Sequence, residues 1–233
     1  MIESCVEKQF QLTVSFYGFN TANIIGARKD NEDVFRSIGV LLADGIAIEW
    51  TSWLFGPRLD VNHRISGDLL CPFLFRRAIQ YGWRTYLLGG SPGIADRAAD
   101  ILRKKYPGLI IVGTHHGYLD SEVEKQSVVD EVNRSRASIV LVGMGQPLQE
   151  NWIVSYKECI HAPVIMAVGG YCDHLTRRID CYPGWVYRWR LNWAYRLITE
   201  PRRLWKKYTF GIMEFCARVL LAKLKVLRQE NFK

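Results

Sequence analysis

The stretch "TYLLGGSPGIADRAADILRKKYPGLIIVG", Thr85 to Gly113, decides the fold. It begins with a short apolar run that ends at two glycines. A segment with helical spacing follows, opened by Ser91-Pro92 and closed by Pro107-Gly108, and a second apolar run completes the stretch. A buried strand, a helix and another buried strand in this order predict two parallel strands joined by a crossover helix.

The same alternation continues downstream. A polar-faced helix is expected over 121–137, a strand over 138–145, a helix over 146–161 and a strand over 162–170. Continuous apolar strands separated by helices are typical of a parallel sheet that is covered on both faces. The sequence therefore predicts an α/β fold with a Rossmann-like, doubly wound, mainly parallel sheet.

The first third of the chain is less regular but fits the same fold. It predicts a strand in "QLTVSFYGF", a helix from about Thr21 to Ile38, a strand that ends before Asp44, and a helix to about Leu54. With 233 residues, 48% of them hydrophobic, the chain is long enough to bury one sizeable core.

The positive charge is concentrated at the C-terminal end. The formal net charge is +8, and the segment from Pro183 to Lys233 contains 12 Lys or Arg and 3 Asp or Glu, so the first 182 residues carry a net charge of −1. Aromatic and aliphatic residues alternate with these cations at helical spacing. We expect a core of residues 1–192 and a basic amphipathic helical appendage of residues 193–233.

Such an appendage suits either an anionic membrane surface or a nucleic acid. Confinement of the charge to one terminal segment beside an almost neutral core favours the membrane, so no nucleic-acid partner is expected. The sequence predicts no membrane span, because no uncharged apolar run reaches about 18 residues. It predicts no signal peptide either, because the N-terminus "MIESCVEKQFQLTV" lacks the basic segment and the apolar core of one. A peripheral protein on the cytoplasmic face is expected, with its six scattered cysteines reduced.

Unusual residues follow the predicted strands. Asp44-Gly45 and the segments 89–93, 113–118, 143–150 and 169–173 stand at strand ends, and each contains glycine. Ligands of doubly wound sheets bind outside the carboxyl ends of the strands, and glycines with helix N-termini suit a diphosphate there. Each loop alone is as well explained by a simple turn. The fingerprints of dinucleotide-binding proteins and P-loop NTPases are absent.

Several motifs together resemble one family, the WecG/TagA/CpsF glycosyltransferases (glycosyltransferase family 26). The resemblance runs from about Thr21 to Tyr208 and includes "TANIIGARKD", "LLADGIAIEW", "RISGDLL", "VLVGMGQPLQENW", "AVGGYCDHLTRR" and "RLITEPRRLWKKY". It implies a bacterial, inverting, metal-independent enzyme that needs no cofactor. Such enzymes move a sugar from a nucleotide donor, usually a UDP-sugar, to a polyprenyl-diphosphate-linked sugar in the synthesis of teichoic acid, common antigen or exopolysaccharide.

The resemblance assigns Asp44 the role of catalytic base. Inverting transfer is a single displacement, so one carboxylate suffices to take the proton of the attacking acceptor hydroxyl. The alternative is that Asp44 only caps the helix that begins near Ile46, a common role for Asp.

The remaining expected site residues follow from the strand ends, for the glycines, and otherwise from the resemblance. Gly89, Gly90 and Gly145 belong to the glycine-rich strand ends. Arg196, Arg202 and Arg203 are expected to stabilise the departing diphosphate, or alternatively to meet lipid phosphates. The other expected substrate-binding residues are Thr21, Asn23, Arg64, Tyr118, Gln149 and Asp173. Helix capping is an alternative for Thr21 and Asn23.

No metal site is expected. The chain lacks a D-x-D motif, and His115 and His116, as neighbours in a strand, should point to opposite faces of the sheet.

The chain departs from the family pattern at "CYPGW", Cys181 to Trp185, where an arginine is usual, and at Asn192, where a glutamate is frequent. A module that binds a nucleotide-sugar or lipid without turnover is therefore the alternative function. The sugar, the acceptor and the assembly state, a homo-oligomer included, are left open.

Overall fold

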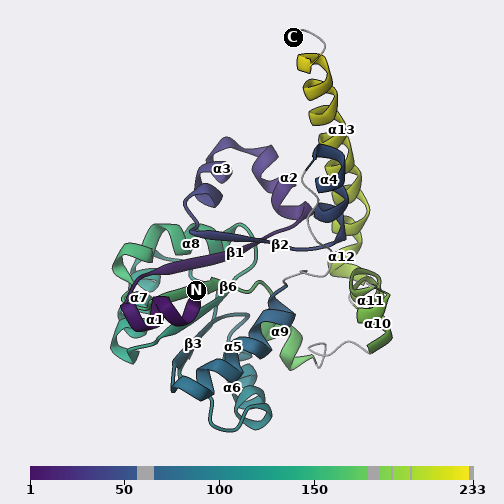
Figure 1. Ribbon diagram of the computed structural model, residues 1–233. Helices are drawn as coiled ribbons and strands as arrows, with labels where there is room; N and C mark the ends of the chain where they lie inside the picture. The colour runs from purple at the N-terminus through teal and green to yellow at the C-terminus, as the bar shows by residue number, and fades with distance from the viewer. Residues whose placement is uncertain (57–65, 178–183, 190, 200, 231–233) are drawn as a thin grey trace. The chain divides into compact units, whose positions relative to one another are not determined.

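A computed structural model describes most of the chain (Figure 1). The described residues form two compact units, which are presented separately below. The first unit comprises Met1–Phe16, Asp33–Leu42 and Ser66–Asp180, and the second comprises Tyr17–Glu32, Ala43–Ile65 and Cys181–Lys233. The described ranges are 1–56, 66–177, 184–189, 191–199 and 201–230. The expected boundary after residue 192 stays a prediction.

The first unit is built on a six-stranded parallel sheet with the order β2-β1-β6-β5-β3-β4. The central register pairs β5 with β3 on one side, Leu141 opposite Leu87, and with β6 on the other, Leu141 opposite Met166. The strands are β1 (Leu12–Tyr17), β2 (Val40–Ala43), β3 (Arg84–Gly89), β4 (Ile110–His115), β5 (Ile139–Gly143) and β6 (Val164–Ala167).

Helices cover both faces of this sheet (Figure 1), which confirms the predicted fold class. Successive strand residues alternate between the two layers: Leu87 packs on one face and Leu88 on the other, both fully buried. One face carries α1 (Ile2–Lys8), α5 (Gly67–Tyr81), α6 (Ile94–Lys105) and α9 (Tyr171–Thr176), and the opposite face carries α7 (Glu122–Ser135) and α8 (Leu148–Tyr156).

The local sequence explains where these helices begin and end. The α6 helix buries Ala98, Ala99 and Leu102 completely and carries three cations in its last turn, where the helix dipole favours positive charge. Ser121 caps α7, because its Oγ accepts a hydrogen bond from the Glu124 N–H at 3.1 Å.

The second unit is helical. Its long helix α13 (Phe210–Glu230) packs against α2 (Phe19–Ala27) and α4 (Ile46–Phe55). The Phe19 ring lies 5.7 Å from the Tyr208 ring and 6.3 Å from the Phe215 ring, and Arg218 Nη1 donates to the Gly26 carbonyl at 2.8 Å. The unit also contains α10 (Gly184–Arg188), α11 (Asn192–Thr199) and α12 (Pro201–Tyr208).

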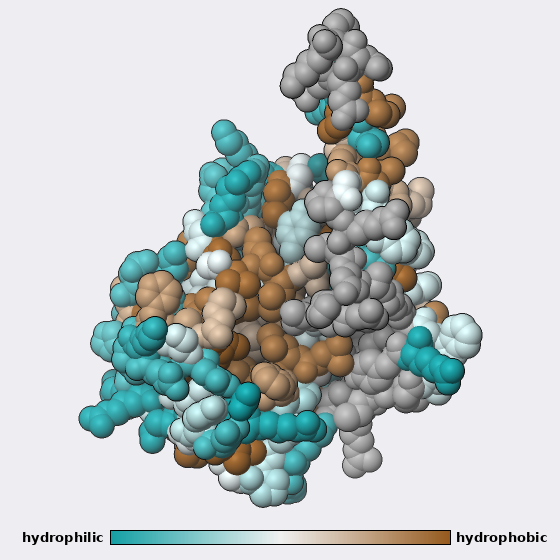
Figure 2. Space-filling view, viewed as in Figure 1, coloured by the Kyte–Doolittle hydropathy of each residue, from teal (hydrophilic) through white to brown (hydrophobic). Residues whose placement is uncertain are grey.

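The C-terminal half of α13 exposes apolar and basic side chains together (Figure 2). Leu220 and Leu221 are each 60% exposed or more, and Lys225 and Arg228 are exposed beside them. No helix in the described ranges is both long enough and apolar enough to cross a bilayer.

One local prediction for the first third was wrong. The single helix expected over 21–38 is two helices, α2 and α3 (Lys29–Arg36), because Arg28 between them is extended and Asn31 Nδ2 donates to the Ile24 carbonyl at 2.8 Å. The 15-residue helix α5, which contains Pro72, was not predicted.

Replacement of Gly143 by Ala should destabilise the first unit. A Cβ at this position would lie 2.7 Å from the Gly169 carbonyl oxygen, a backbone atom. We expect a loss of about 1–3 kcal/mol in the free energy of unfolding, measured with urea. Gly67→Ala is the matched control, because its Cβ would meet nothing closer than 3.8 Å. Equal stability of the two variants would contradict this packing.

Candidate functional site

The carboxyl ends of three neighbouring strands in the first unit meet through glycine backbones. Gly89 ends β3, Gly143 ends β5, and Gly169 follows β6 by two residues. A Cβ on Gly89 would collide with Gly143, and one on Gly143 with Gly169. Glycine is therefore required at Gly89 and Gly143 so that the backbones can approach closely. We refer to these three residues as the glycine cluster.

A glutamine side chain ties two loops of this region together. Gln149 is 2% exposed, and its Oε1 accepts hydrogen bonds from Gly145 N–H at 3.2 Å and Gly169 N–H at 3.0 Å. The loop after β5 and the loop after β6 are thus held by one side-chain amide. The structure shows Gln149 as a buried brace, and its expected contact with substrate stays a prediction.

A buried carboxylate holds the glutamine in turn. Glu150 is fully buried, and its Oε1 accepts from Ser15 Oγ at 2.6 Å, Gln149 Nε2 at 2.8 Å and Gln146 Nε2 at 3.4 Å. Burial raises the pKa of Glu150 because the charged form loses its hydration, and the three donors oppose this shift. Gln146 Nε2 also donates to the Phe16 carbonyl at 2.9 Å, which links the loop to β1.

The hydrogen bonds change the expected role of the glycines. The N–H of Gly90 donates to the Gly143 carbonyl at 3.2 Å, and that of Gly145 is used by Gln149. By contrast, a Cβ on Gly145 or Gly169 would meet no atom within 4 Å. A ligand at these strand ends would therefore meet the bare glycine surface of the loops rather than these particular amides.

Asp44 follows the last residue of β2. Its N–H donates to the Tyr17 carbonyl at 2.9 Å, and one of its carboxylate oxygens is buried. The N-cap position of α4 is occupied by Gly45 with φ +91°, so Asp44 lies one residue before the cap, and the capping alternative stays a prediction. Its expected role as the base is untested by the geometry and stays a prediction.

Thr21 and Asn23 are buried in the first turns of α2. Thr21 Oγ1 accepts from the Gly18 N–H at 3.1 Å, which is the capping contact considered for this residue. Asn23 does not cap: its Nδ2 donates to the Gly211 carbonyl at 2.7 Å, at the start of α13. Within the described ranges its Oδ1 is buried without a hydrogen-bond partner.

The structure describes some of the remaining expected site residues and not others. Tyr118 is 62% exposed after β4, Asp173 is half-buried in α9, and Arg202 is exposed in α12. Arg64 lies outside the described residues, and the side chains of Arg196 and Arg203 are likewise outside the description.

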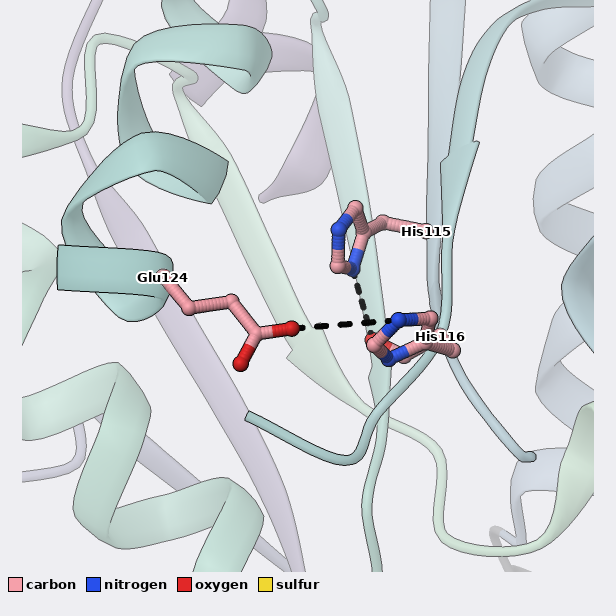
Figure 3. Close-up of side chains that lie close together, drawn as sticks. All are labelled: His115, His116 and Glu124. Carbon is pink, nitrogen blue, oxygen red and sulfur yellow. Dashed lines mark hydrogen bonds and ion pairs between the residues drawn. The ribbon is translucent and has the colours of Figure 1, made fainter. Parts of the chain in front are cut away.

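The two adjacent histidines do not point to opposite faces, so that geometric argument was wrong. His115 is the last residue of β4 and His116 lies beyond it, which frees the second ring from the alternation of the strand. The ring centroids are 4.4 Å apart, and Glu124 from the first turn of α7 faces them (Figure 3).

Sequence reasoning singled out none of Ser15, Gln146 and Glu150 as a site residue. Their signal is the polar run "GQPLQE" at a strand end beside a buried strand that contains a lone serine. Buried polar groups must be paired, which could have suggested a network.

Comparison with known proteins identifies the family of the chain. The family model described as "Glycosyl transferase WecG/TagA/CpsF family" matches residues 1–229. The chain belongs to this family. The resemblance found in the sequence is thereby confirmed, and by family the protein is a glycosyltransferase.

Three relatives have two different activities in their names. An "N-acetylglucosaminyldiphosphoundecaprenol N-acetyl-beta-D-mannosaminyltransferase" of Bacillus spizizenii is 30% identical over 176 residues, which is 76% of this chain and 66% of the relative. The same enzyme of Bacillus subtilis is 30% identical over 179 residues, 77% of this chain and 68% of the relative. This chain thus spans about two thirds of the length of both.

A third relative is named "UDP-Gal:alpha-D-GlcNAc-diphosphoundecaprenol beta-1,4-galactosyltransferase" and comes from Shigella boydii. It is 28% identical over 171 residues, 73% of this chain and 71% of the relative. All three names include a GlcNAc group linked through diphosphate to undecaprenol, whereas the transferred sugar differs.

The Glu150→Gln variant should change the pH dependence of stability. Folding raises the pKa of the Glu150 carboxyl group. Between the unfolded and the folded pKa values, the folded state therefore binds more protons than the unfolded state, and the free energy of unfolding falls as the pH rises through this interval. The neutral amide removes this loss. Urea unfolding at several pH values above about 4.3 should show the wild type losing stability relative to Glu150→Gln. Exposed Glu158→Gln is the control, and parallel pH profiles of wild type and Glu150→Gln would contradict the assignment.

Proposed function

We propose that this protein is an inverting, metal-independent glycosyltransferase. It transfers a sugar from a UDP-sugar to a polyprenyl-diphosphate-linked sugar in the synthesis of a bacterial cell-surface polysaccharide. The observation that carries this proposal is the match of residues 1–229 to one glycosyltransferase family. The open glycine surface at Gly145 and Gly169 suits a bulky donor at the strand ends and supports it.

The names of the relatives favour a class of acceptor rather than one donor sugar. The Bacillus and Shigella enzymes share a GlcNAc-diphosphoundecaprenol acceptor while moving N-acetylmannosamine or galactose. Epimers differ in the orientation of one hydroxyl group, a difference read by a few hydrogen bonds. We therefore assign a UDP-hexose or UDP-N-acetylhexosamine donor and a lipid-diphosphate acceptor, with the individual sugar left to experiment.

The proposed step is a single displacement. The acceptor hydroxyl oxygen forms a bond with the anomeric carbon while the bond from that carbon to the diphosphate oxygen breaks, and UDP leaves with the electron pair. The proton of the hydroxyl passes to the Asp44 carboxylate as general base. Arg196, Arg202 and Arg203 supply the positive charge that offsets the charge developing on the diphosphate, in place of a metal ion.

We also propose peripheral attachment to an anionic membrane through α12 and α13. The exposed leucines of α13 alternate with exposed cations, the pattern of a helix that lies in the membrane interface. This attachment brings the protein to a lipid-linked acceptor without a membrane span.

The alternative is a binding module without turnover. The departures at Cys181 to Trp185 and at Asn192 favour it, because they replace residue types usual in the family. Such a module would bind a UDP-sugar but release no UDP.

Asp44→Asn should abolish transfer. The amide keeps the size of the side chain but cannot take a proton, so we expect a fall of about 10²–10⁴-fold in turnover with donor affinity retained. The measurement is UDP release by purified protein with a synthetic polyprenyl-diphosphate-linked sugar and a panel of UDP-sugars, in EDTA. Exposed Asp30→Asn on α3 is the matched control.

Normal turnover by Asp44→Asn would remove the base assignment. Strict dependence on magnesium or manganese would contradict metal independence. A wild-type protein that binds a UDP-sugar but gives no product with any acceptor would be the binding module.

Neutralising cations of the C-terminal appendage, residues 193–233, should weaken membrane binding. Lys206, Lys225 and Arg228 are exposed, and each cation near an anionic surface contributes about 1 kcal/mol. The triple change to Gln should therefore lower the affinity for phosphatidylserine-containing vesicles by about a hundredfold in sedimentation assays. The control changes Lys8, Arg97 and Lys104 to Gln, which are exposed in the first unit. Equal losses of vesicle affinity in both variants would exclude a specific role for the appendage.

A further inference from the structure

We propose that His115, His116 and Glu124 form a binding site for one divalent transition-metal ion of the zinc class (Figure 3). The site lies in the first unit, where the end of β4 faces the first turn of α7. It takes no part in the transfer step and does not depend on the proposed function.

The three side chains already converge. One ligand atom from each residue lies within 4.8 Å of the others, and His116 Nε2 is 3.8 Å from Glu124 Oε1. A tetrahedral zinc ion with bonds of about 2.0–2.1 Å holds neighbouring ligand atoms about 3.3 Å apart. Contraction by about 1.5 Å or less would therefore complete the coordination.

Backbone hydrogen bonds orient two of the ligands. His115 Nδ1 lies 2.8 Å from the His116 carbonyl oxygen, which can only accept, so Nδ1 carries the proton and Nε2 keeps a free lone pair. Donation of one ring N–H to a carbonyl is the usual support of a metal-binding histidine. Glu124 Oε2 accepts from the Asp120 N–H at 3.0 Å, which leaves Oε1 directed toward His116.

His116 gives the independent reason to expect a ligand. Its Nδ1 is buried without a hydrogen-bond partner among the described residues, and its Nε2 is beyond hydrogen-bond distance of Glu124. A buried polar atom without a partner is rare and costly. Coordination through Nδ1 would give this buried atom a partner, whereas coordination through Nε2 would use the nitrogen that faces Glu124.

The types of ligand in the site indicate which ion it would bind. Two imidazoles and one carboxylate suit zinc and its neighbours in the first transition series, whereas magnesium and calcium prefer oxygen ligands alone. The His116 and Glu124 side chains are 30% and 32% exposed, which leaves an entry path and room for water as the fourth ligand. The competing account is a plain His116–Glu124 ion pair, which needs a protonated imidazole and no metal.

A bound ion would fix the segment that leads to the glycine cluster. The Gly117 N–H donates to the Gly90 carbonyl at 2.8 Å, and a Cβ on Gly117 would lie 3.1 Å from Gly89 Cα. The ion would thus join α7 to the turn that packs against the end of β3. We expect it to stabilise this edge of the first unit.

The test is a zinc titration of the full-length protein after removal of metal with EDTA and dialysis, followed by competition with a chromophoric chelator at pH 7.5. We expect one zinc ion per chain and a loss of affinity of at least about tenfold in each of His116→Ala and Glu124→Gln. The titration is repeated with Cys159→Ser and Cys216→Ser together, because these exposed thiols could bind zinc themselves.

Two matched controls should leave the affinity unchanged. Glu122→Gln alters a carboxylate in the same helical turn, and His161→Ala removes an exposed imidazole elsewhere. Circular dichroism verifies that each variant folds, and shifts of the wild-type histidine ring signals on zinc addition, followed by NMR, give a second readout that needs no variant. Absence of saturable binding, or equal binding by wild type and both ligand variants, would overturn the proposal and leave the ion pair.

Discussion

The organisation of the first unit depends on the buried carboxylate of Glu150. Its Oε1 receives donors from β1, from the loop after β5 and from Gln149 of its own helix. Gln149 then holds the N–H groups of Gly145 and Gly169. A buried network of this kind stabilises only when its members are paired, so the loss of one member leaves several donors unsatisfied.

Gln149 was expected to bind substrate, and the structure shows it as a member of this buried network. The residues "QPLQE" resemble a substrate-binding motif, yet in the structure the side chains of Gln146, Gln149 and Glu150 form hydrogen bonds that hold the loops together from within. The glycines allow strand ends to pack closely, and the open positions are at Gly145 and Gly169. The chemistry is then left to groups carried by other loops, and Asp44, immediately after β2, is our candidate for the base.

Most of the fold was predictable because burial on both sides leaves continuous apolar strands between helices with clear start and stop signals. The prediction failed where local signals conflict: α5 contains Pro72, and the helix expected over 21–38 is interrupted at the extended Arg28. For the site, the strand ends were predictable from topology. The Ser15–Glu150 contact was not, since it joins residues 135 positions apart, and the His115–His116 geometry depends on where β4 ends.

The central claim is that the protein performs a single-displacement sugar transfer to a lipid-linked acceptor. The most direct test is the structure of the product: mass spectrometry of the lipid after reaction with the active UDP-sugar, and the anomeric configuration of the new linkage by NMR. The account predicts an acceptor heavier by one sugar residue, with the anomeric configuration opposite to that of the donor. A product with retained configuration would contradict a mechanism that uses Asp44 as a single base, and an unmodified lipid with every donor would contradict transfer itself.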